Sequence, residues 1–358
     1  MAVDLSTYFQ QQAARHHRAV VFWHTESNSH KHRVEQLLQQ QQAVFIHQVG
    51  NFRTLLGTEH TLLYNDLASR WNANALVGIS GTLKGQGLLI IAVNKTTANL
   101  PSVQHWQGSF STGQTYHCRQ SQELITLLTH WPELQAHTNV VRPFVANSMQ
   151  QQTLNLLNQL KGKQALLLYA PRGRGKTATL AHWLSKPHSF HRRFICAPSK
   201  LQAAPLLAEA IDAIFLPPDQ LTKHVFNQQD LLLIDEAATL PIAGQNVALY
   251  FPGTLVLATT TEGYEYAGRG FIIRFAHTLK QQFPRLHIAH LEMPMRWHTG
   301  DALETANSIA FGLYPNDHVH AGIHPQAHTE VSQPVHIEHE FAPCKAFTHK
   351  QRFAIFRL

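Results

Sequence analysis

The sequence predicts an α/β protein with two domains, each built around a parallel β-sheet. Three observations lead to this fold class: short apolar segments alternate with helix-like segments, the alternation restarts near residue 145, and a glycine-rich loop joins one apolar segment to a helix. Continuous apolar runs are typical of strands buried on both faces, and strands that alternate with helices form a parallel sheet. The length of 358 residues fits two domains of roughly 100–200 residues each.

The first domain is predicted to be a Rossmann-like α/β module over residues 1–145. Its expected strands are short, apolar and rich in branched or aromatic side chains, and they cover residues 19–23, 43–47, 61–65 and 88–93. No nucleotide-binding fingerprint is found among these segments. We therefore expect no catalytic site here, and we interpret the domain as a degenerate lobe that clamps RNA.

The second domain is predicted to span residues 146–317. Asn147 or Ser148 is expected to cap a helix that runs to about Leu160. The expected strands then cover residues 165–169, 193–197, 231–235, 254–260 and 271–275. Residues 318–358 form a histidine-rich tail, which we expect to be poorly ordered; its irregular histidine spacing does not favour a metal site.

The composition limits the function classes. Lys and Arg number 29 against 22 Asp and Glu, which gives a net charge of +7. This charge favours a polyanionic partner weakly, and ordinary variation among proteins explains it equally well. Three widely spaced cysteines argue against a disulfide scaffold, and strand-sized apolar runs argue against a membrane span. We expect a cytoplasmic protein without membrane contact.

Residues 170–177 read APRGRGKT and come close to the phosphate-binding pattern GxxxxGK[ST]. The last three residues match the pattern, whereas its first position is occupied by Ala170 and a further glycine lies inside the loop at Gly173. A buried strand is expected before the loop and a helix after it, up to about Ser185. The alternative is a chance glycine-rich turn, but this context favours a RecA-like P-loop NTPase domain with a parallel sheet.

The residue types in the loop suit ATP with Mg²⁺. Gly173 and Gly175 would let backbone N–H groups approach phosphate oxygens, and the start of the helix favours an anion. Lys176 is expected to contact the β- and γ-phosphates, and Thr177 is expected to hold the metal ion.

The segment LLLIDE, residues 231–236, supplies the acidic partners of the loop. Asp235 is expected at the end of a neighbouring strand, where its carboxylate can bind Mg²⁺ together with Thr177. Glu236 is expected to orient or deprotonate the attacking water. The alternative is that Asp235 only caps the next helix.

Three further segments carry weaker signals. The threonines at 259–261 end a strand and would sense the γ-phosphate, or they only reflect the β-propensity of threonine. Residues 262–271, EGYEYAGRGF, suit contacts with RNA bases and phosphates, and a hairpin without ligand is equally compatible. Arg296 in MPMRWH would neutralise γ-phosphate charge, although a surface ion pair is the more common role for such an arginine.

With these motifs in order, the chain resembles the bacterial tRNA(Met) cytidine acetyltransferase family. The resemblance covers about residues 1–317 and includes APRGRGKT, LLIDEAATLP, ATTTEGYEYAGRGFIIRF, MPMRWHTGDALE and, in the first domain, SGTLKGQGLLIIAV. It implies an N-terminal module followed by a helicase-like ATPase module. In the whole family enzyme, ATP hydrolysis assists N4-acetylation of the wobble cytidine of elongator tRNA(Met), with acetyl-CoA as the donor.

The resemblance also implies which residues contact ATP. These are Gln151, the stretch beginning at Gly173, and Arg296; the stretch comprises Gly173, Arg174, Gly175, Lys176, Thr177, Ala178, Thr179 and Leu180. The family's acetyltransferase domain is not expected in this chain, because only 36 residues follow Gly322 and none of them is glycine. A truncated or frameshifted product, or one part of a split enzyme with a separate acetyltransferase chain, remains open.

The sequence thus predicts a P-loop ATPase module of this family, which binds and hydrolyses ATP in support of tRNA acetylation. Lys176, Glu236 and Arg296 are the expected catalytic residues. Two alternatives stay open: a nucleotide-dependent tRNA-binding module that does not hydrolyse ATP, and a DNA helicase-like ATPase.

Overall fold

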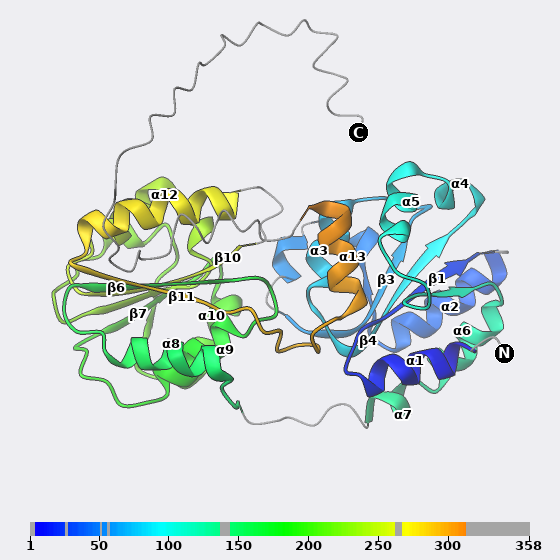
Figure 1. Cartoon of the computed structure of the whole chain (residues 1–358), viewed down its shortest axis with the longest axis horizontal. Helices are drawn as coiled ribbons and strands as arrows, with labels where there is room; N and C mark the ends of the chain where they lie inside the picture. Colours follow the sequence, from blue (N-terminus) through cyan, green and yellow to red (C-terminus); the bar gives the residue numbers. More distant parts are fainter. Residues whose placement is uncertain are drawn as a thin grey trace, which may run out of the picture. The chain divides into compact units, whose positions relative to one another are not determined.

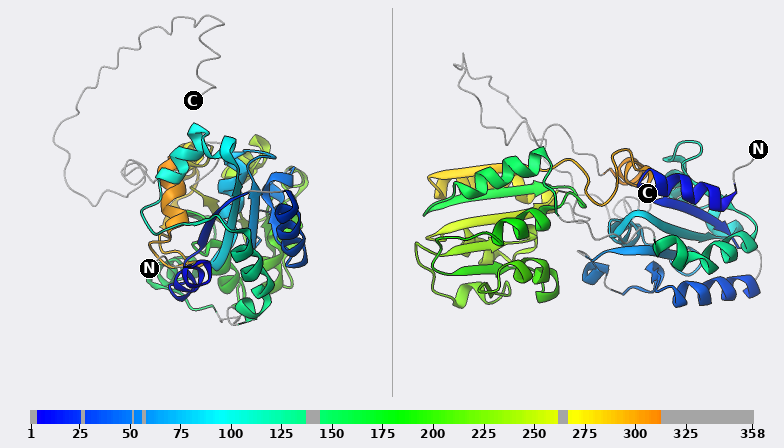
Figure 2. Two further views of the ribbon diagram at one scale, coloured as in Figure 1. Left: turned by 90° about the vertical axis from the view of Figure 1, so that its right-hand side faces the viewer. Right: turned by 90° about the horizontal axis from the view of Figure 1, so that it is seen from below.

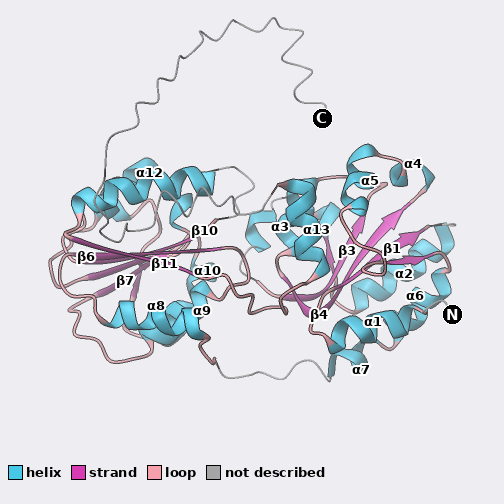
Figure 3. Ribbon diagram, in the orientation of Figure 1, coloured by secondary structure: helices cyan, strands magenta, loops and turns pink. Residues whose placement is uncertain are grey.

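The computed structural model describes residues 4–25, 28–50, 52–55, 58–136, 144–261 and 267–312. All of these residues belong to one compact unit, Met1–Ile323. Within it, two separate β-sheets are each covered by helices on both faces (Figure 3). Both sheets contain only parallel strand pairs among these residues, which confirms the predicted fold class.

The first sheet has the strand order β2-β3-β4-β1-β5. Its strands are β1 (Ala19–His24), β2 (Val44–Phe45), β3 (His60–Asp66), β4 (Leu83–Val93) and β5 (Tyr116–Cys118). Its helices are α1 (Leu5–Ala14), α2 (Asn28–Gln40), α3 (Ala73–Ser80), α4 (Lys95–Ala98), α5 (Pro101–Gly108), α6 (Ser121–Thr129) and α7 (Trp131–Ala136), with the 3-10 turns η1 (Ile46–Gln48) and η2 (Phe52–Leu55).

Strand β1 shows why this sheet needs helices on both faces. Its side chains alternate between two cores: Val21 and Trp23 pack with α1, α2 and α6, whereas Val20 and Phe22 pack with α3 and α5. All four are fully buried. A strand with two apolar faces has to be covered on both sides, as the continuous apolar run AVVFW predicts.

The second sheet has the strand order β11-β6-β10-β9-β7-β8. Its strands are β6 (Gln164–Ala170), β7 (Arg193–Cys196), β8 (Ile214–Phe215), β9 (Leu231–Ile234), β10 (Thr254–Thr260) and β11 (Arg285–His290). Helices α8 (Ser148–Asn158), α9 (Lys176–Leu184) and α10 (Lys200–Glu209) cover one face, and α11 (Ile242–Leu249) and α12 (Ala267–Gln282) cover the other (Figure 1). The 3-10 turns η3 (Leu221–Lys223) and η4 (Ala237–Thr239) complete this part.

The last helix, α13 (Ala302–Phe311), packs against the first sheet, although the sequence places it in the second domain. Leu303 lies in the same core as Val20 and Phe22. The helix lies beside α5 (Figures 1 and 2), where Trp106 donates a hydrogen bond of 2.8 Å to Asn307. The predicted boundary near residue 145 stays a prediction, but the chain returns to the first core after residue 300.

One predicted strand is wrong. Residues 271–275 were expected as a strand, whereas the backbone is helical from Ala267 to Gln282 in α12. Phe275 and Leu279, four residues apart, are both buried against the sheet, which is the spacing of a helix face. A short apolar run does not distinguish a strand from a buried helix. Strands β5, β8 and β11 were not predicted because they are short or carry polar side chains.

Helix α8 confirms the predicted N-cap. Asn147 accepts a hydrogen bond of 2.9 Å from the backbone N–H of Gln150, and the Gln150 side chain accepts one of 3.0 Å from the backbone N–H of Asn147. This reciprocal capping box fixes the start of the helix. The tail 318–358 and Glu262–Tyr266 lie outside the described residues.

A buried ion pair joins α13 to the first sheet. Arg18 donates to Asp301 through its guanidinium at 2.6 and 3.0 Å and through its backbone N–H at 2.8 Å. The two side chains are 2% and 0% exposed. Removing one member of a buried pair leaves the other charge without a partner.

We therefore predict that Asp301→Ala lowers the free energy of unfolding by about 3–5 kcal/mol. The matched control is Asp212→Ala, because Asp212 pairs with Arg193 at the surface and its side chain is 72% exposed. The control should cost less than about 1 kcal/mol. Urea unfolding of both variants measures the difference, and equal losses would contradict the assignment of a structural role to the buried pair.

Candidate functional site

The predicted phosphate-binding loop connects β6 to α9 at the carboxyl edge of the second sheet. Gly173 and Gly175 adopt φ angles of +74° and +77°, which side chains other than glycine rarely adopt. Gly175 is the N-cap of α9, and no side chain caps this helix start. Glycine has no side chain that could accept from the N–H groups of the first helical turn, and such a helix start suits an anion such as phosphate.

Lys176 lies at the start of α9 and is only 7% exposed. Its ammonium group donates to the carbonyl oxygens of Ala170 and Pro171 at 3.3 and 3.4 Å. The side chain therefore folds back over the loop, where a cation would meet a bound phosphate. Ala170 is the last residue of β6, so the absence of the usual first glycine does not prevent the loop from forming.

Thr177 and Asp235 come together although 58 residues separate them in the chain. The hydroxyl of Thr177 donates a hydrogen bond of 2.8 Å to the Asp235 carboxylate. Asp235 follows β9, which is not the neighbour of β6 as we expected, because β10 lies between the two strands. The contact brings two hard oxygen ligands to the start of α9, and such ligands are the kind that Mg²⁺ binds.

The Asp235 carboxyl has an unusual affinity for protons. It is 7% exposed. Burial, together with the negative charge of Glu236, raises the pKa of Asp235 from 3.8 to about 6, whereas Thr177 and Lys176 act in the opposite direction. A bound divalent cation would favour the ionised form, so this carboxylate is suited to a site that holds one.

Glu236 follows directly and has a strained backbone. Its φ of +55° and ψ of +48° are left-handed, a conformation that costs roughly 1–2 kcal/mol for a residue with a side chain. The carboxylate accepts hydrogen bonds from the Thr260 hydroxyl at 2.8 and 3.0 Å. Thr260 ends β10, so the strand between β6 and β9 fixes the direction of the Glu236 side chain. Strain of this kind is common at functional sites.

The other threonines of this strand end differ. The Thr259 hydroxyl is buried and makes no hydrogen bond within the described residues. Thr261 donates its backbone N–H to the Ala170 carbonyl at 3.1 Å. Thr260 is thus the residue of this group that contacts the acidic pair.

Gln151 and Gln150 take different positions on α8. Gln151 is exposed, and its side chain amide donates to Asn155 at 3.3 Å. Gln150 is fully buried and donates to the Arg174 carbonyl in the loop at 3.3 Å. Gln150 was not among the predicted site residues, although its place in the capping box, three residues after Asn147, is a signal in the sequence.

The side chains of the remaining loop residues point in different directions. The Arg174 side chain points to the backbone carbonyls of Glu292 and Arg172, at 2.8 and 3.0 Å. The Thr179 hydroxyl donates a hydrogen bond of 2.8 Å to the Gly175 carbonyl. Of its two neighbours in the chain, Ala178 is exposed to solvent and Leu180 is buried in the core.

The structure does not bring Arg296 to Lys176. Its guanidinium donates to the Gly81 carbonyl at 2.9 Å and to Glu59 at 3.3 Å. The side chain is 21% exposed. Arg296 therefore contacts residues of the first domain in this conformation.

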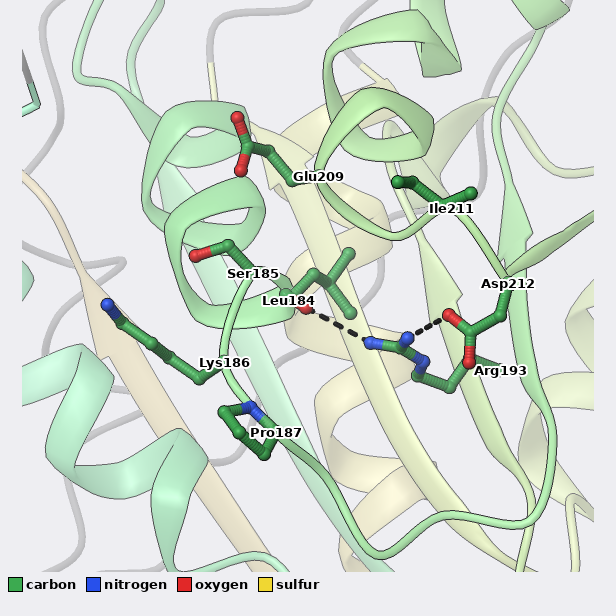
Figure 4. A pocket seen from close by; sticks show the side chains of 8 residues that line it. All are labelled: Leu184, Ser185, Lys186, Pro187, Arg193, Glu209, Ile211 and Asp212. Carbon is green, nitrogen blue, oxygen red and sulfur yellow. Dashed lines mark hydrogen bonds and ion pairs between the residues drawn. The ribbon is translucent and has the colours of Figure 1, made fainter.

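A separate groove of about 610 Å³ lies away from the loop (Figure 4). In it, Arg193 points to the Leu184 carbonyl and the Asp212 carboxylate. Leu184 ends α9 and Arg193 begins β7, so the groove is at the amino ends of the strands, opposite the loop. It does not share residues with the candidate site.

The described residues contain neither a cluster of metal ligands nor a membrane-spanning helix. Within those ranges, no three His, Cys, Asp or Glu side chains gather as a metal site. Among the helices of the described part, none has the length and apolar character to cross a bilayer.

Comparison with known proteins agrees with the order of the motifs. Residues 1–130 match the N-terminal domain of tRNA(Met) cytidine acetyltransferase TmcA, and residues 208–313 match the helicase domain of RNA cytidine acetyltransferase NAT10/TcmA.

Two bacterial TmcA proteins are similar in sequence to most of this chain. The TmcA protein of Vibrio cholerae is 31% identical over 291 residues, which cover 72% of this chain and 38% of the relative. The TmcA protein of Pectobacterium atrosepticum is 31% identical over 306 residues, which cover 74% and 42%. The chain therefore spans about two fifths of the length of these relatives.

A solved structure of Bacteroides Pif1 bound to single-stranded DNA is 16% identical, with a TM-score of 0.29 over 42% of this chain and 43% of that one. A score this low supports no functional conclusion.

The raised pKa of Asp235 leads to a stability prediction. The folded state holds this proton more tightly than the unfolded state, so the carboxyl causes no loss of stability below about pH 4 and a growing loss as the pH rises to 6. Asp235→Asn should therefore raise the free energy of unfolding at pH 7 by about 1–3 kcal/mol.

Urea unfolding at pH 4.5 and pH 7 measures the effect, because the gain from Asp235→Asn should be smaller at the lower pH. Asp219→Asn, in an exposed position, is the control and should change neither value. A variant that is less stable than the wild type at pH 7 would contradict the assigned cost of burial.

Proposed function

The chain belongs to the tRNA(Met) cytidine acetyltransferase family, and we propose that its second domain binds ATP with Mg²⁺ and hydrolyses it in support of tRNA acetylation. The observation that carries the proposal is the hydrogen bond of 2.8 Å between Thr177 and Asp235 at the end of the glycine loop. A loop that only turned the chain would have no need of a buried acid beside it.

The loop residues suit a triphosphate. The positive φ angles of Gly173 and Gly175 let the loop backbone turn toward a phosphate, the start of α9 favours an anion, and Lys176 offers a buried cation. We assign Lys176 to the β- and γ-phosphates. Gln150 supports the loop from α8, and the exposed Gln151 is available for the rest of the nucleotide.

Thr177 and Asp235 fit Mg²⁺ because both offer oxygen ligands from adjacent elements. When bound, Mg²⁺ would reduce the negative charge of the β- and γ-phosphates. The buried carboxyl of Asp235 would then be ionised, which accounts for an acid in a position that is costly without a cation.

Glu236 is the residue that we assign to the water. Thr260 holds its carboxylate at the carboxyl edge of the sheet, next to Asp235. Glu236 would direct the water oxygen to the γ-phosphorus and accept its proton, while the bond to the β–γ bridging oxygen breaks. Arg296 is assigned to γ-phosphate charge, and it would have to exchange Glu59 for the nucleotide to do so.

The acetyl transfer belongs to the whole protein in which these domains act. We propose that it uses acetyl-CoA and elongator tRNA(Met), in a domain outside the described residues or on a separate chain. The net charge of +7 supports contact with tRNA phosphates. A family of bacterial tRNA-modifying proteins also supports a location in the cytoplasm.

Two other functions would give different results when phosphate release is measured. A nucleotide-dependent tRNA-binding module would bind ATP without phosphate release, with or without tRNA. A DNA helicase-like ATPase would be stimulated by single-stranded DNA more than by tRNA. Phosphate release by the full chain, titrated with elongator tRNA(Met) and with single-stranded DNA, separates all three.

We predict that Lys176→Ala lowers the rate of phosphate release by about 10²–10³-fold, because a buried cation that contacts the phosphates is lost. Far-UV circular dichroism should remain that of the wild type. Lys161→Ala removes an exposed lysine before β6 and serves as the matched control. Hydrolysis by Lys176→Ala at the wild-type rate would remove the basis of the site assignment.

Glu236→Gln should separate binding from hydrolysis. The amide still accepts a hydrogen bond from Thr260 but no longer accepts a proton from water, so phosphate release should fall by about 10²–10⁴-fold. Equilibrium binding of ADP should change little, and Glu133→Gln, at an exposed position of α7, should match the wild type in both assays. Loss of binding without a specific loss of turnover would show that Glu236 has only a structural role.

A further inference from the structure

The turn of the glycine loop is held by residues that lie more than 100 positions later in the chain. Met295 donates its backbone N–H to the Gly173 carbonyl at 2.8 Å. The Arg174 side chain, in a residue that is 9% exposed, donates to the Glu292 carbonyl at 2.8 Å. The same guanidinium forms an ion pair of 2.5 Å with Glu304.

Trp297 packs directly on this turn and is 3% exposed. A Cβ atom at Gly173 would lie 2.8 Å from the edge of the Trp297 six-membered ring, so the indole fills the space beside the glycine. The Arg18 guanidinium lies 3.6 Å from the centre of the Trp297 ring, which is a cation–π contact. The indole is thus fixed on two sides.

Glu304 connects the indole to the loop. Its carboxylate accepts a hydrogen bond of 2.8 Å from the Trp297 indole N–H and also pairs with Arg174. Asp301 caps α13 by accepting the Glu304 backbone N–H at 3.0 Å, and it is held in turn by Arg18. One carboxylate therefore joins the side chain of the loop arginine to the aromatic ring that covers the loop glycine.

These contacts reduce the conformational entropy that a glycine-rich loop loses when it binds a ligand. Two residues with positive φ let the backbone face a phosphate, but a glycine-rich turn has many other conformations, and selecting one of them weakens binding. An external brace that holds the turn before the ligand arrives reduces that cost. Three different groups hold the turn: Met295 binds the Gly173 carbonyl, Glu304 binds the Arg174 side chain, and Trp297 packs on Gly173.

We propose that Trp297 and Glu304 are positioning residues, which hold the loop in the conformation that binds the nucleotide. Glu304 acts through Arg174, and Trp297 acts through Gly173. The proposal rests on the proposed nucleotide site. Because binding coupling is reciprocal, a nucleotide that shifts the turn also changes the surroundings of Trp297.

The test measures equilibrium binding of ADP with Mg²⁺ to the full chain, together with KM and kcat for phosphate release. Glu304→Gln keeps the size of the side chain but loses the charge that Arg174 requires. Trp297→Phe keeps the ring but loses the donor to Glu304. The controls are Glu209→Gln, at an exposed position, and Trp131→Phe, in the core of the first sheet.

Glu304→Gln should weaken ADP binding by about tenfold and raise KM by a similar factor, with a smaller change in kcat, since Glu304 touches no reacting atom. In a chain that already carries Arg174→Ala, the same substitution should change binding by less than about twofold, because its effect passes through Arg174. Nucleotide should alter the tryptophan emission of the wild type more than that of Trp297→Phe.

If Glu304→Gln and Trp297→Phe bind ADP as tightly as the wild type, the inference is wrong. It is also wrong if Glu304→Gln weakens ADP binding by the full factor in the chain that already carries Arg174→Ala. Either result, with clear Mg²⁺-dependent binding to the wild-type chain, leaves the proposed ATP site intact. Failure of the wild type itself to bind nucleotide would overturn both the site and the inference.

Discussion

The conformation of the loop after β6 determines where the other groups of the site lie. Gly173 and Gly175 both require positive φ, and a Cβ at Gly175 would lie 2.7 Å from the Gln150 amide. This backbone allows α9 to begin at Gly175, directly at the carboxyl edge of the sheet. The same geometry places Lys176 over the loop and Thr177 against Asp235. A different loop conformation would leave these side chains without a common centre.

Two groups of the site lower the stability of the fold, and packing of the surrounding sheet offsets this loss. Asp235 is a buried acid next to another acid, and Glu236 has a left-handed backbone. Thr260 contacts the Glu236 carboxylate from the strand that separates β6 and β9. Fully buried leucines on β6 and β9 supply the packing that offsets these costs. Burial and strain concentrated beside a phosphate loop are typical of a site kept for chemistry.

Much of this arrangement follows from local sequence, and the rest depends on contacts between distant residues. Apolar runs predicted eight of the strands, and APRGRGKT and LLLIDE predicted the loop and the acidic pair. The run FIIRF was misread because its length suits either a strand or a helix, and Phe275 and Leu279 show helical spacing only when the longer segment is considered. The capping-box spacing from Asn147 indicates that Gln150 lies at a helix start. The contacts that Gln150 and Glu304 make with Arg174 are tertiary, and no spacing in the chain reveals them.

The segment from Glu292 to Glu304 links the loop to the first sheet through side chains of both parts. Arg296 donates to the Gly81 carbonyl, and Arg18 contacts both Trp297 and Asp301. We expect a triphosphate to bind where this segment, β6 and α9 meet. Calorimetric titration of the full chain with a non-hydrolysable ATP analogue measures this binding. The expected result is one saturable site per chain whose affinity falls when Mg²⁺ is withheld; no saturable binding, or an affinity that does not depend on Mg²⁺, would show that the triphosphate site is wrong.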